Sequence, residues 1–215
     1  MTLSLKTRPS ARQATKGDAK AVELLLNPNS AEIHGSLEMD TTLRTAIGSQ
    51  FGAAIDMLDN ALRACPDELW RVRLWGNPSM PPEFSEFWYV AYHTLFWLDL
   101  YLSGAVEGFA PPAPFTLDEL DPAGVLPDRV YTKADLQTYL DHSRQKYRAT
   151  INALTDEQAV RRCKFAWGEC SFAELLLDNM RHVKEHAAQL NLILGQKNAS
   201  DSRWVAKTKS KSGNE

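Results

Sequence analysis

Apolar residues recur at three- and four-residue steps through four long segments, and this spacing constrains the fold more than any other feature of the sequence. Such steps place the apolar side chains along one face of an α-helix. They predict helices over residues 41–64, 83–102, 132–154 and 172–195. Each helix would bury its apolar face against its neighbours. We therefore expect an all-α fold, specifically a four-helix bundle.

Capping residues support the predicted starts of three of these helices. Asp40 is placed to cap the first one. Thr132 with Asp135, and Ser171 with Glu174, follow the capping-box pattern at the starts of the third and fourth helices. The third and fourth helices should therefore begin close to these residues.

Two connections also stand out. Residues 104–131 contain five prolines and would form a long crossover loop between the second and third helices. A loop of this length within one domain is usually functional, for example as a lid. Residues 161–170 would be a short connector to the fourth helix.

The two ends of the chain lack helical periodicity. Residues 1–39 would form an N-terminal arm, and residues 196–215 a polar, flexible C-terminal tail. A chain of 215 residues with 44% apolar composition is long enough for one sizeable core. We expect that core within residues 40–195.

Composition excludes several classes of function. The net charge of −3, with both signs interspersed, gives no basic surface for nucleic acid or an anionic membrane. The most apolar run, residues 84–102, contains Glu86 and Asp99, and each would be costly at bilayer depth, so this run predicts a buried helix. An odd number of cysteines, Cys65, Cys163 and Cys170, argues against a disulfide framework and favours a cytoplasmic protein.

Two histidines in the fourth helix form the main candidate for chemistry. His182 and His186 stand four residues apart, so both imidazoles lie on one helix face and can reach one metal ion. His93, in the middle of the second helix, is the natural third partner because bundle interiors bring side chains of facing helices together. Three histidines would leave a fourth metal position open, as in catalytic zinc sites. Asp178, four residues before His182, is placed to hydrogen-bond an imidazole N–H.

Two other interpretations of these histidines stay open. They could form a polar network inside the bundle without a metal. The stretch from His182 to His186 also matches the H-x-x-E-H pattern of inverted zinc peptidases, with Glu185 as general base. That pattern needs a third ligand downstream, where the only acidic residues are Asp201 and Glu215. Glu185 lies off the ligand face and is expected in solvent.

Three stretches resemble the DinB-like superfamily of bacterial four-helix bundle metalloproteins: residues 92–97, residues 125–140 and residues 181–191, the last with the pattern H-x-x-x-H-x-x-Q-L-N. The resemblance covers residues 40–195. It implies that His93, His182 and His186 bind a divalent metal ion, with zinc or nickel the usual choice.

The resemblance also implies possible activities. Some members of the superfamily are thiol-dependent transferases or isomerases that use low-molecular-weight thiols, and others are hydrolase-like. We therefore expect a metal-dependent enzyme that activates a thiol or water for a small-molecule substrate. The alternative is a non-catalytic, metal-binding scaffold protein associated with stress. No catalytic residue follows from the sequence.

Apolar residues outside the helices predict association. A homodimer is expected because aromatic residues in loops are typical of interface cores, and the resemblance points the same way. The residues concerned are Leu69, Trp70, Trp75, Met80, Phe165 and Trp167. Packing under the N-terminal arm is the alternative. The remaining histidines, His34 and His142, are expected at the surface, and the cysteines are expected to be passive.

Overall fold

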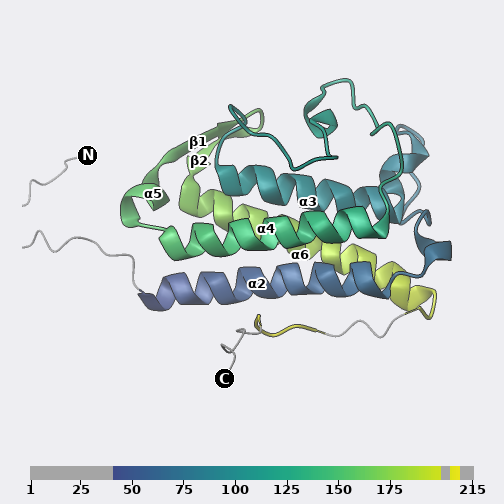
Figure 1. Cartoon of the computed structure of the whole chain (residues 1–215), viewed down its shortest axis with the longest axis horizontal. Coiled ribbons are helices and arrows are strands. Elements are labelled where there is room, and N and C mark those ends of the chain that lie inside the picture. Colours follow the sequence, from purple (N-terminus) through teal and green to yellow (C-terminus); the bar gives the residue numbers. More distant parts are fainter. Residues whose placement is uncertain (1–40, 200–203, 209–215) are drawn as a thin grey trace, which may run out of the picture. The chain divides into compact units, whose positions relative to one another are not determined.

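A computed structural model describes residues 41–199 and 204–208, so the predicted arm at residues 1–39 lies outside the described residues. Four long helices run side by side (Figure 1). Helix α2 packs against α4 and α6, and α3 packs against the same two helices. The predicted all-α class is confirmed. The bounds of the four are α2 Thr41–Ala64, α3 Phe87–Ser103, α4 Lys133–Ala153 and α6 Phe172–Gln196.

Shorter elements fill the connections. A helical turn, α5 (Asp156–Val160), follows α4. The predicted connector before α6, residues 161–170, forms an antiparallel hairpin of β1 (Arg162–Phe165) and β2 (Gly168–Ser171). Cys163 lies opposite Cys170 in this hairpin. Short 3-10 helices lie at Asp67–Leu69, Pro82–Ser85 and Asp118–Leu120. The last of these is within the long connection between α3 and α4, which Figure 1 shows passing beside α3.

Side-chain caps fix the starts of α4 and α6. At α4 the backbone N–H of Asp135 donates to the Thr132 hydroxyl at 3.1 Å, and the Asp135 carboxylate accepts from the Thr132 N–H at 2.8 Å. This is the predicted capping box. At α6 the Glu174 N–H donates to the Ser171 hydroxyl at 3.2 Å, and only this half of the predicted box forms.

The start of α3 differs from the prediction. The sequence predicts a helix from residue 83, but Glu86 is extended, with φ −70° and ψ 146°, and the α-helix begins at Phe87. A β-bridge between Arg73 and Glu86 holds this segment extended, and Phe87 N–H donates to Val72 O at 2.9 Å. Because Arg73 and Glu86 are not neighbours in the sequence, no local pattern predicts this bridge or the later start of α3.

Helix α3 is buried on almost every side, as the sequence predicts for residues 84–102. No helix among the described residues is long and apolar enough to cross a membrane. The core gathers large side chains from all four long helices. Among the fully buried ones are Phe51, Ile55, Leu58, Tyr92, Phe96, Leu136, Tyr139, Leu175 and Leu190.

Part of the C-terminal segment contacts α2. The Thr208 N–H donates to Ser49 O at 3.2 Å, and the Gln50 side chain donates to Ala206 O at 3.0 Å. The division into an arm, a bundle and a flexible tail stays a prediction.

Candidate metal centre

Three histidines from two helices meet inside the bundle. His182 and His186 lie one turn apart on α6, and their ring centroids are 4.6 Å apart. His93 faces them from α3, with its Nε2 atom 3.3 Å from Nε2 of His182. One ring nitrogen from each residue lies within 4.8 Å of the other two. The structure thus brings together all three histidines that the sequence singled out.

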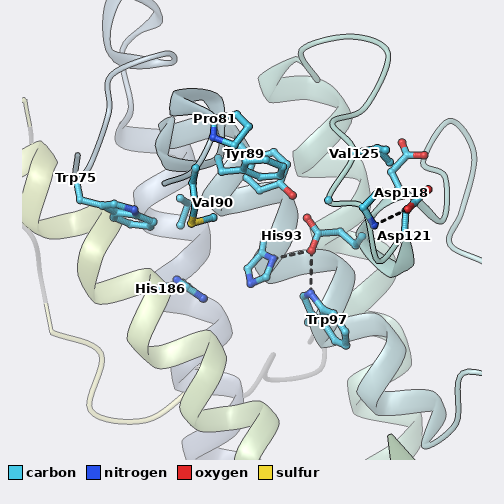
Figure 2. Close-up of a pocket in the computed structure, with 15 residues that line it drawn as sticks. Trp75, Pro81, Tyr89, Val90, His93, Trp97, Asp118, Asp121, Val125 and His186 are labelled. Atoms are coloured by element: carbon cyan, nitrogen blue, oxygen red, sulfur yellow. Dashed lines mark hydrogen bonds and ion pairs between the residues drawn. The ribbon is translucent and has the colours of Figure 1, made fainter. Parts of the chain in front are cut away.

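Hydrogen bonds orient two of these rings. Nδ1–H of His93 donates to Glu119 Oε2 at 2.7 Å, and the indole N–H of Trp97 donates to the same oxygen at 2.9 Å (Figure 2). Nδ1–H of His186 donates to the side-chain oxygen of Gln189 at 2.8 Å. Both Nε2 atoms are therefore left as lone-pair donors, as metal-binding histidines require.

Burial favours the neutral form of the two imidazoles on α6. It lowers the pKa of His182 to about 2, with further contributions from His93 and His186. Burial lowers the pKa of His186 too, and the neighbouring His93 adds to this effect. Neutral imidazole is the form that binds a metal.

The carboxylate beside His93 is held in its charged form. Burial alone would raise the pKa of Glu119, but the hydrogen bond and charge of His93 outweigh it, and the net pKa is lowered. The Glu119 side chain is only 5% exposed. A buried carboxylate that orients one imidazole is a common partner of a metal-bound histidine.

The prediction that Asp178 hydrogen-bonds an imidazole N–H is wrong. Asp178 is half-exposed, and its nearest charged partner is Arg181 at 3.5 Å. Glu119 has the role instead, from the loop between α3 and α4. The sequence indicated that this loop is functional, but no spacing rule connects Glu119 to His93 because the two are 26 residues apart.

Other residues considered from sequence lie away from the centre. Glu185 is exposed, as expected, and so is His142, whereas His34 lies outside the described residues. All three cysteines are buried thiols. Burial raises the pKa of Cys65 to about 12 and also raises the pKa values of the other two, so none is prepared to act as a thiolate.

A cavity of about 590 Å³ reaches the histidines. His93 and His186 line it, together with aromatic and apolar side chains from α3, the segment before α3 and the long loop. In Figure 2, Trp75 and His186 lie on one side of His93, and Asp118, Asp121 and Val125 lie on the other. The volume is within the range of small-molecule sites.

The donor set fits a divalent ion. Three imidazoles converge, two of them with their outer nitrogens hydrogen-bonded, and the cavity gives access to two of the three rings. Nδ1 of His182 is buried without a hydrogen-bond partner, so no hydrogen bond to its outer nitrogen orients this ring.

Comparison with known proteins gives one finding. A family model described as the DinB superfamily matches residues 50–190. Searches of curated proteins and of solved structures found no significant match.

Proposed function

Because this chain belongs to the DinB superfamily, we propose that it is a metal-dependent enzyme with a three-histidine site. His93, His182 and His186 would hold one divalent ion, zinc or nickel, since imidazole suits both. The reaction would be attack of a thiol or water on a small organic molecule, as in a thiol S-transferase or a hydrolase. Three free, buried cysteines support a reducing compartment, and we propose the cytoplasm.

One observation carries this proposal: the histidine cluster lies at the wall of a cavity. Catalytic metal sites keep a position open to substrate, whereas structural sites are closed by four protein ligands. Among the described residues, no fourth His, Cys, Asp or Glu joins the cluster. The cavity therefore favours an enzyme over the alternative, a metal-binding scaffold without catalysis.

A divalent ion at this site would supply a lowered pKa for a thiol or water at its open position. The chain's own residues would do the rest. Glu119 accepts the Nδ1 proton of His93 in a hydrogen bond, so the lone pair is on Nε2, which faces α6. Gln189 fixes the same tautomer of His186. The aromatic side chains of the cavity would position the substrate.

A substrate panel tests the proposed activity. Purified protein would be stripped of metal, reloaded with zinc or nickel, and assayed with several thiols against electrophilic substrates, and with esters and amides in water. We expect turnover only after reloading. His182→Ala should lose it, whereas His142→Ala, which changes an exposed histidine on α4, should retain it.

The same panel decides between the two functions. Metal that binds at the site without turnover on any thiol, ester or amide would favour the non-catalytic scaffold. Equal turnover by metal-stripped and reloaded protein would contradict a metal-dependent reaction.

A further inference from the structure

The charged groups that line the cavity all have one sign. Asp118, Glu119 and Asp121 are part of its wall, and no lysine or arginine is. Within the described ranges, neither Asp118 nor Asp121 forms an ion pair with a basic side chain. Asp118 accepts from the Thr116 hydroxyl, and Asp121 accepts from the Ala123 N–H at 2.8 Å. These partners are neutral, so both negative charges stay uncompensated.

The third acid of the wall, Glu119, already has hydrogen-bond partners in the protein. Oε2 of Glu119 accepts from His93 and Trp97, and hydrogen bonding by the Tyr89 hydroxyl also lowers the pKa of this carboxylate. Asp118 and Asp121, whose partners are neutral, are therefore the acids available to a ligand cation.

The uncharged part of the wall is largely aromatic. Trp75, Phe84, Tyr89 and Trp97 line the cavity, and Phe84 and Tyr89 pack edge to face with ring centroids 4.8 Å apart. Aromatic faces attract cations, most strongly where water is excluded. An aromatic wall beside uncompensated carboxylates complements an apolar molecule that carries positive charge.

We infer that the substrate class of this cavity is organic amines, with an aromatic or aliphatic body and a protonated nitrogen beside Asp118 and Asp121. The inference rests on the proposed function, because it takes the ligand of the cavity to be the substrate. The two aspartates lie across His93 from His186 (Figure 2), so the amine would bind at the end of the cavity away from His186.

Two probes of the same shape test the charge preference. Phenethylamine is a cation at neutral pH, and 2-phenylethanol is its uncharged analogue. Binding to the zinc-reconstituted full chain would be followed by calorimetry and by tryptophan fluorescence, since Trp75 and Trp97 line the cavity. We expect the amine to bind about three- to tenfold more tightly, with a smaller difference at high salt.

Matched variants test where the preference comes from. Asp118→Asn combined with Asp121→Asn should remove it and leave binding of the alcohol unchanged. Asp128→Asn, a change to an exposed acid of the same loop that does not line the cavity, should retain it. Equal affinities of the two probes for the wild-type protein, or a preference that survives the double substitution, would overturn the inference.

Zinc content measured on the same samples separates the two proposals. A bound zinc ion without any amine preference refutes the inference and leaves the metal site standing. An amine preference in protein that takes up no zinc refutes the proposed function and still supports the charge selectivity of the cavity.

Discussion

Glu119 connects the long loop to the histidine cluster through a single side chain. Its Oε2 atom accepts hydrogen bonds from both His93 and Trp97. We expect Glu119→Gln to weaken zinc binding by about 10- to 100-fold, as is typical when such a partner of a metal-bound histidine is lost. Competition with a chromogenic chelator would measure the affinity.

Asp178 gives the matched control for Glu119. It is the carboxylate that the sequence favoured, yet it lies against Arg181. Asp178→Asn should therefore leave zinc affinity unchanged. An equal loss in both variants would mean that general electrostatics, and not orientation of His93, explains the effect.

The low pKa of His182 predicts how stability depends on pH in the metal-free protein. Burial lowers this pKa from 6.5 to about 2, so the residue is neutral when folded but becomes protonated when unfolded below about pH 6.5. The unfolded state then binds more protons, and the free energy of unfolding should fall with decreasing pH. The contribution is at most about 1.4 kcal/mol per pH unit between these two values.

Urea unfolding at about pH 7 and about pH 5 would measure this slope. His182→Gln removes the titrating group and should show a smaller loss of stability on acidification than the wild type. Identical slopes for the two proteins would contradict the assignment of the low pKa to His182.

At the scale of elements, a charged contact joins α3 to α4. Lys146 Nζ lies 2.5 Å from Asp99 Oδ1 and 2.6 Å from the Ser103 hydroxyl, and the Asp99 side chain is 1% exposed. Lys146→Met would leave the carboxylate buried without its main partner, so we expect a loss of about 3 kcal/mol in the free energy of unfolding.

Two further variants define the cause of that loss. Adding Asp99→Asn to Lys146→Met should recover most of the stability, because the buried charge is then gone. Arg162→Ala breaks an exposed pair with Glu169 and should cost less than about 1 kcal/mol. A small effect of Lys146→Met alone, measured by denaturant unfolding, would contradict this account.

The elements were predictable where local chemistry determines them. The bounds of α2 follow from its apolar period, and those of α4 from the Thr132 capping box. The start of α3 was not predictable because it depends on the bridge between Arg73 and Glu86. The same distinction between local and long-range contacts applies to the site. The spacing of His182 and His186 is local and was predictable, whereas the contact of Glu119 with His93 depends on how the long loop packs and was not.

At the scale of the whole molecule, the homodimer stays a prediction. Two residues on which it was based pack within the chain: the Trp70 indole N–H donates to Tyr131 O at 2.9 Å, and Phe165 is buried. Trp75 and Met80 line the cavity but are 39% and 46% exposed. Trp167 remains 52% exposed. It stacks on Phe165, with ring centroids 5.7 Å apart.

Light scattering tests the association. We expect a mass of twice the 24.1 kDa chain at micromolar concentration. Trp167→Ser should shift the protein toward monomer if the exposed indole is part of the interface, whereas Trp204→Ser changes another exposed tryptophan and should not. A strictly monomeric wild-type protein would contradict the dimer prediction.

The metal content of the purified protein tests the central claim most directly. Protein expressed with metal supplied, and purified without a metal-affinity column, would be analysed for zinc and nickel by elemental mass spectrometry. We predict about one divalent ion per chain, as expected for a single three-histidine site. His182→Ala should lose the ion, and His142→Ala should keep it. An empty wild-type site would contradict the account.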